Sequence, residues 1–85
     1  MAAYLISERK ITLILKAIKK DDQALIILLG EGAYLGLKPW PAETIFCLKD
    51  SALERGLNAV LPSNVQLIDY DQVIKLIADQ QIYCY

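Results

Sequence analysis

The chain contains no histidine and only two cysteines, Cys47 and Cys84. Without an imidazole there is no Ser-His-Asp triad, no Cys-His dyad and no histidine ligand for a metal. The two cysteines lie too far apart in the sequence to form a CxxC redox site or half of a zinc site. The composition therefore excludes most hydrolase sites, and we expect no metal, no cofactor and free thiols in a reducing compartment.

An excess of positive charge is also absent, since 9 basic residues face 10 acidic ones and the net charge is −1. This balance predicts no direct binding of nucleic acid, and the lysines at 16, 19 and 20 are better explained as one solvated helix face. No apolar run reaches the roughly 18 residues that span a bilayer, so we expect no membrane association. The segment MAAYLISERK lacks the pattern of a signal peptide. A cytoplasmic location is expected.

What the chain has in quantity is apolar surface. Hydrophobic residues make up 55% of its 85 residues, and the mean hydropathy is +0.33. A chain of this length forms one domain, residues 1–85, and such a small domain buries only roughly 60% of its unfolded surface. We therefore expect it to associate with other subunits, either homologous chains or further copies of itself.

Short apolar runs predict the strands. The clearest, Ala24 to Leu29, is continuously apolar, which is typical of a strand covered on both faces of a parallel sheet. The other expected strands are Ala3 to Ile6, Thr44 to Leu48, Val65 to Ile68 and a short last one, Ile82 to Tyr85.

Helical patterns separate these runs. We expect helices at Glu8 to Lys20 with Ser7 as its N-cap, at Ala33 to Leu37, and at Asp50 to Arg55 with Asp50 as its cap and Gly56 ending it. Regular alternation predicts an α/β fold: one small three-layer domain with a mainly parallel sheet of four to five strands and helices on both faces.

The segment VQLIDYDQVIKLI, residues 65–77, passes from a strand directly into a helix. Asp69 and Asp71 resemble an acid pair, but no base or metal ligand accompanies them, so one of them is expected to cap the helix. The inward face of that helix is predicted to comprise Val73, Ile74, Ile77 and Ala78.

Three segments in order resemble the TusB/DsrH family of small sulfur-relay subunits. They are Leu25 to Leu37, the run IFCLKDSALERGL at 45–57, and VQLIDYDQVIKLI followed by an aromatic end, Ile82 to Tyr85. The resemblance implies a fold like that of DsrE, DsrF and DsrH. It also implies a complex with TusC- and TusD-like subunits that relays persulfide sulfur toward 2-thiouridine at the wobble position of tRNA.

In that family the TusD-like subunit carries the reactive cysteine, and the resemblance implies that this chain is chiefly a structural, non-catalytic partner. DsrH-like chains of sulfur oxidisers often have a cysteine in their first helix, whereas the expected helix Glu8 to Lys20 has none. A DsrH-like role in sulfur oxidation is therefore an alternative rather than the leading expectation.

A second alternative is a homo-oligomeric sulfurtransferase that carries persulfide on Cys47. This residue lies near the end of an expected strand and before a helix N-terminus, whose amides stabilise a thiolate. The favoured interpretation is a buried cysteine that acts as a small hydrophobe, because the neighbouring Asp50 would oppose a thiolate. Cys84 could be a sulfur acceptor or a residue without a role on a terminal strand.

Aromatic residues are the candidates for subunit interfaces, because they combine a large contact area with a polar group. The candidates are Tyr34, Trp40, Tyr70, Tyr83 and Tyr85.

Overall fold

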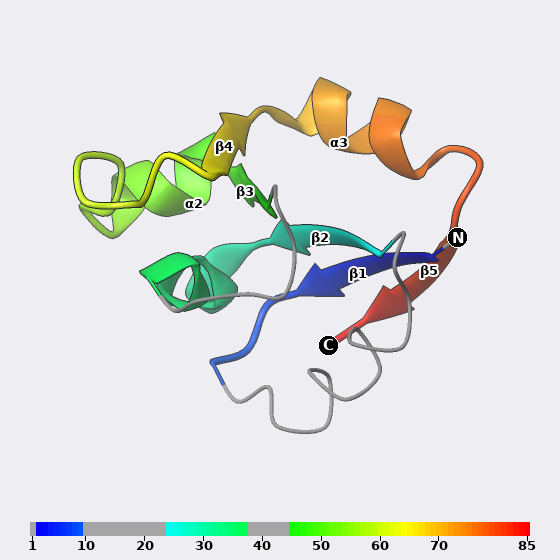
Figure 1. Ribbon diagram of the computed structural model, residues 1–85, viewed down its shortest axis with the longest axis horizontal. Coiled ribbons are helices and arrows are strands. Elements are labelled where there is room, and N and C mark those ends of the chain that lie inside the picture. The colour runs from blue at the N-terminus through cyan, green and yellow to red at the C-terminus, as the bar shows by residue number, and fades with distance from the viewer. Residues whose placement is uncertain (1, 10–23, 38–44) are drawn as a thin grey trace.

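The computed structural model describes residues 2–9, 24–37 and 45–85. Five strands and three helices lie in these ranges (Figure 1). In chain order they are β1 (Ala2–Ile6), β2 (Leu25–Leu28), the 3₁₀ helix η1 (Gly30–Leu37), β3 (Ile45–Leu48), α2 (Lys49–Glu54), β4 (Val65–Ile68), α3 (Tyr70–Ile77) and β5 (Gln81–Cys84). Each predicted strand is present, and its observed ends differ from the predicted ones by at most one residue.

All neighbouring strands pair in parallel, in the order β4-β3-β2-β1-β5. The chain adds strands in one direction from β1 to β4 and then returns to place β5 beside β1. Because parallel crossovers are right-handed, this reversal carries α3 to the opposite face of the sheet from α2. The predicted α/β fold with a mainly parallel sheet and helices on both faces is confirmed (Figure 1).

Each face of the sheet has its own apolar cluster. On the side that we call the α2 face, η1 and α2 pack against residues of β1 to β4, including Tyr4, Ile26, Cys47 and Val65. On the other side, the α3 face, a smaller cluster contains Ile27, Leu48, Ile68 and Val73, with Leu5, Leu25, Leu29, Phe46, Leu76 and Ile77 partly buried against it. Among the described elements, the eight-residue helix α3 buries fewer residues on its face than η1 and α2 bury on theirs.

The junction between β4 and α3 is stabilised by a capping box. The Asp69 carboxylate accepts a hydrogen bond from the Gln72 amide at 2.9 Å, and the Gln72 side chain accepts one from the Asp69 amide at 3.1 Å. These two bonds satisfy backbone donors that a helix start leaves unpaired. Of the two acids proposed as caps, Asp69 is the one that caps the helix.

The end of α2 is a Schellman motif. Gly56 adopts a φ of 67°, and its amide donates to the Leu53 carbonyl, while the Leu57 amide donates to that of Ala52 at 2.8 Å. The buried Leu57 side chain completes the motif. The predicted role of Gly56 is confirmed.

Gly32 is fixed by a close backbone approach. A Cβ atom at this position would collide with the Ile6 carbonyl at the end of β1. The Gly30 to Gly32 segment therefore begins η1, packed against β1, and the helical segment predicted at Ala33 to Leu37 starts three residues earlier.

Two local predictions were wrong. Asp50 does not cap α2, because β3 runs directly into a helix that begins at Lys49, and Leu48 occupies the N-cap without a side-chain bond. Ile74 and Ala78 do not face the sheet, since both are exposed, and Leu76 packs inward with Val73 and Ile77 instead.

The helix expected at Glu8 to Lys20 lies outside the described residues from position 10 onward, and Glu8 and Arg9 form a bend after β1. Ser7, its expected N-cap, donates its hydroxyl hydrogen to the Tyr85 carbonyl at 3.0 Å. Among the helices that the structure describes, none is long and apolar enough to cross a membrane.

Candidate functional site

The carboxyl ends of the five strands meet at one edge of the sheet. In open parallel sheets this is the edge where ligands bind. Polar residues follow the strands there: Ser7 after β1, Glu31 after β2, Ser51 after β3 and Asp69 after β4. Across this edge, the Gly30 amide donates to the Ser51 hydroxyl at 2.9 Å, which ties the start of η1 to α2.

Two arginines meet one carboxylate at this edge. Arg9 donates through Nε to Glu31 at 3.0 Å, and Arg55 approaches the other carboxylate oxygen at 3.6 Å. The Arg9 guanidinium also lies 4.1 Å from the centre of the Tyr34 ring, a cation–π arrangement. Arg55 is mostly buried, and one of its nitrogens donates to the Ser51 carbonyl at 3.2 Å.

The cluster holds η1 against the ends of β1 and α2. Glu54 also approaches Arg55 at 3.6 Å, so the two arginines are balanced by two carboxylates. The pair between Arg9 and Glu31 is exposed on both sides, and ion pairs of this kind stabilise by at most about 1 kcal/mol. The sequence reasoning missed this cluster. Its signal was a base and an acid following two consecutive strands, but only the pairing of β1 with β2 brings them together.

Cys47 lies inside the α2 face and has 0% exposure. Burial raises the pKa of its thiol to about 11 from 9.0, and the positive charge of Arg55 counteracts only part of this effect. Its sulfur lies 3.7 Å from the Leu48 carbonyl, as a weak donor. The thiol is therefore protonated at neutral pH and closed off from solvent.

Cys84 is exposed on β5, in register with Leu5 of β1. Strands β2 and β1 separate it from Cys47, so the two residues are roughly 14 Å apart across three strand spacings. The structure does not bring the two thiols together. Within the described ranges, no three acidic, cysteine or histidine side chains gather as a possible metal site.

The aromatic candidates fall into different surroundings. Tyr83 stacks on Tyr4 with ring centres 5.4 Å apart, and Tyr85 stacks on the same ring at 6.3 Å. Tyr34 is half-buried beneath Arg9, whereas Tyr70 is exposed at the start of α3. Trp40 lies outside the described residues.

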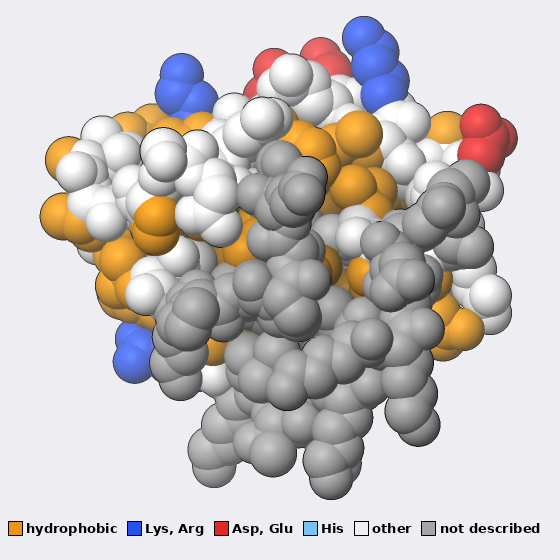
Figure 2. Space-filling view, viewed as in Figure 1, with side chains coloured by type: hydrophobic (Ala, Val, Ile, Leu, Met, Phe, Trp, Pro, Cys, Tyr) orange, Lys and Arg blue, Asp and Glu red, His pale blue; other side chains and the backbone are white. Residues whose placement is uncertain are grey.

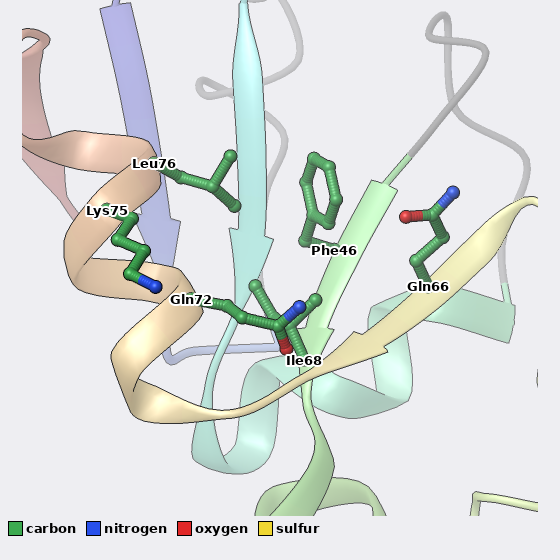
Figure 3. Close-up of a pocket in the computed structure, with 6 residues that line it drawn as sticks. All are labelled: Phe46, Gln66, Ile68, Gln72, Lys75 and Leu76. Carbon is green, nitrogen blue, oxygen red and sulfur yellow. The ribbon is translucent and has the colours of Figure 1, made fainter.

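A hollow of about 250 Å³ lies on the α3 face between α3 and the strands β3 and β4. Phe46, Ile68 and Leu76 form its apolar walls, and Figure 3 shows Phe46 and Leu76 projecting toward it from β3 and α3. The remaining lining residues are polar or charged: Gln66, Gln72 and Lys75. Figure 2 shows exposed apolar atoms near the charged side chains at the top of the view, where α3 lies.

No family model matches the chain, and no curated protein matches its sequence significantly. Among solved structures, the crystal structure of the ychN protein from E. coli matches with a TM-score of 0.69 and 10% sequence identity. The match covers 100% of this chain and 99% of that one. The chain has a DsrE-like fold. At 10% identity the likeness concerns the DsrE-like architecture alone, and the predicted TusB membership remains a prediction.

Proposed function

We propose that this chain is a non-catalytic subunit of a cytoplasmic sulfur-relay assembly. Its partners would be TusC- and TusD-like chains, and the pathway would be 2-thiolation of the tRNA wobble uridine. The DsrE-like fold and the three segments that resemble TusB/DsrH support this assignment. In this role the chain shapes the surface on which a partner hands on its persulfide.

The burial of Cys47 is the observation that carries the non-catalytic assignment. A sulfur carrier needs an accessible thiolate near neutral pH. The Cys47 thiol has 0% exposure and a pKa of about 11. These properties argue against the alternative in which Cys47 carries persulfide, and they suit a residue that packs as a small hydrophobe.

Sulfur loading of the intact protein tests this function. The folded chain is treated with a persulfide donor and weighed, because each bound sulfur adds about 32 Da. We expect no adduct on Cys47. A stable adduct that disappears in Cys47→Ala would establish the carrier role and refute the proposal.

Assembly is tested with TusC- and TusD-like chains encoded in the same genome. We expect co-purification and faster sulfur delivery from the loaded TusD-like chain when this subunit is present. Cys47→Ala should retain that stimulation, whereas a variant lacking the TusD-like cysteine should lose delivery. Failure of the wild-type chain to join or stimulate the other two would overturn the assignment.

A further inference from the structure

In the part of the chain that the structure describes, β5 is a short edge strand, and no other described strand or helix lies along its outer edge. Its sequence, Gln81 to Cys84, contains no charge and no proline, and all four residues are exposed. Natural edge strands are usually protected by lysine, proline, a bulge or a covering element. Within the described residues, this edge is therefore open to pairing with another strand.

The hydrogen-bonding pattern of β5 defines which backbone groups are free. The Tyr85 amide donates to the Leu5 carbonyl and the Tyr85 carbonyl accepts from the Ser7 amide, so both groups of Tyr85 point toward β1. Successive residues of a strand alternate in direction. The backbone groups of Tyr83 therefore also point toward β1. Those of Ile82 and Cys84 point away from β1, to the outer edge, where no described strand pairs with them.

The two residues with free backbone groups flank Tyr83 symmetrically. If a second β5 approaches antiparallel with Tyr83 opposite Tyr83, then Ile82 of each copy lies opposite Cys84 of the other. Each such pair can exchange both of its N–H···O=C bonds, because residues opposite each other with outward groups form the hydrogen-bonded pairs of an antiparallel ladder. This register satisfies every free backbone group of Ile82 and Cys84.

The side chains suit the same register. The Tyr83 ring already stacks on Tyr4 within one chain, at 5.4 Å and an interplanar angle of 22°. In a non-hydrogen-bonded antiparallel pair, opposite side chains have their Cβ atoms about 4.5–5.5 Å apart. Two Tyr83 rings would therefore meet across the axis and extend the stack. Ile82, which is 45% exposed, would pack against Cys84 of the second copy on the α3 face.

We propose that two copies of this chain pair through β5 about a two-fold axis at Tyr83, which joins their five-stranded sheets into one continuous sheet. A second copy is the favoured occupant because the edge is complementary to itself, and a two-fold contact closes without exposing a new edge of the same kind. The inference rests on strand geometry and would hold whether or not the chain serves sulfur relay.

The contact is small, and its strength should reflect this. A single short strand with its flanking aromatic side chains buries less than the roughly 1,600 Å² of a standard interface. We therefore expect a dimer that dissociates on dilution, with a dissociation constant on the order of micromolar. Sedimentation velocity or native mass spectrometry of the purified chain across a concentration series measures it.

Two matched lysine variants test the surface. Ile82→Lys places a charge on the β5 edge, and Ile74→Lys makes the same change at a more exposed isoleucine, 61%, on α3. We expect Ile82→Lys to weaken dimerisation at least tenfold and Ile74→Lys to leave it unchanged, with the same circular dichroism for both. A monomeric wild-type chain, or a dimer equally sensitive or insensitive to both changes, would overturn the proposal.

A cross-link tests the register. In the Cys84→Ser background, Tyr83→Cys places two thiols directly opposite each other, at a Cα separation of about 4.5 Å that a disulfide can bridge. We expect a disulfide-linked dimer under mild oxidation. In the wild-type dimer the two Cys84 residues would be roughly 8 Å apart, too far to bridge, from the spacing along and between strands. Linkage of the wild-type chain through Cys84, or a Tyr83→Cys variant that still dimerises without forming the cross-link, would refute this register.

Discussion

Alkylation of Cys47 in the folded chain measures how completely the α2 face of the sheet is closed. At pH 7.5, a thiol with a pKa of 9.0 is about 3% thiolate, and one with a pKa of about 11 is about 0.03% thiolate. The more basic thiolate is also the better nucleophile, which restores roughly a six- to tenfold factor. The raised pKa alone should therefore slow the alkylation of Cys47 by about tenfold relative to a thiol with a pKa of 9.0. Its 0% exposure slows the reaction further, because the packed face must open before the reagent can reach the sulfur.

The assay is iodoacetamide labelling followed by peptide mass spectrometry, with Cys84 as the exposed reference in the same molecule. We expect native Cys47 to react at least tenfold more slowly than the same residue in a urea-unfolded chain, while Cys84 labels readily in both states. The native rate of Cys47 should keep rising with pH up to about 11. Equal native rates at Cys47 and Cys84 at pH 7.5 would refute the argument from burial and would reopen the carrier alternative.

Three further predictions concern residues at the carboxyl-end edge of the sheet, and urea unfolding monitored by circular dichroism measures all three. Asp69→Ala should lower the free energy of unfolding by about 1 kcal/mol, because it removes the α3 capping box; a loss no larger than that of Asp71→Ala would contradict this. Gly32→Ala should cost about 3 kcal/mol, because its Cβ would collide with the Ile6 carbonyl. Gly30→Ala, where φ is 51° but the space is open, should cost about 1–2 kcal/mol.

The strands were predictable because each apolar run is bounded by polar residues or glycine, and short buried strands have few alternatives. The ends of α2 and α3 were also predictable from single residues, since Gly56 supplies a positive φ and Asp69 supplies a side-chain acceptor. Which residues of α3 face the sheet was harder to predict from the sequence. Ile74 and Leu76 are both apolar on an eight-residue helix, so two apolar faces fit the sequence and only packing against the sheet selects one.

The candidate site was less predictable than the fold, for two physical reasons. The cluster of Arg9, Glu31 and Arg55 depends on which strands are neighbours, and sequence order does not determine that β1 lies between β2 and β5. The state of Cys47 depends on which face of the sheet is better covered. Its strand, Ile45 to Leu48, is apolar at every position, so alternation gave no indication of burial.

Most of the exposed large apolar side chains lie on α3 or at β5, and we expect these elements to contact other subunits. Eight large apolar residues are exposed among the described residues, and five belong to α3, to β5 or to the residue that follows β5: Tyr70, Ile74, Ile82, Tyr83 and Tyr85. The chain changes direction across the sheet once, between β4 and β5, in the strand order β4-β3-β2-β1-β5. Right-handed crossovers therefore place α3 on the face opposite η1 and α2. The same topology leaves β5 as an edge that no later strand of the described chain covers. Cys47 is closed inside the α2 face, whereas Tyr83 and Tyr85 are exposed beside Tyr4 on that same face, and Ile82 is exposed on the α3 face. Apolar side chains are thus exposed on both sides of β5, and we expect a second chain that pairs with β5 to contact them on both sides.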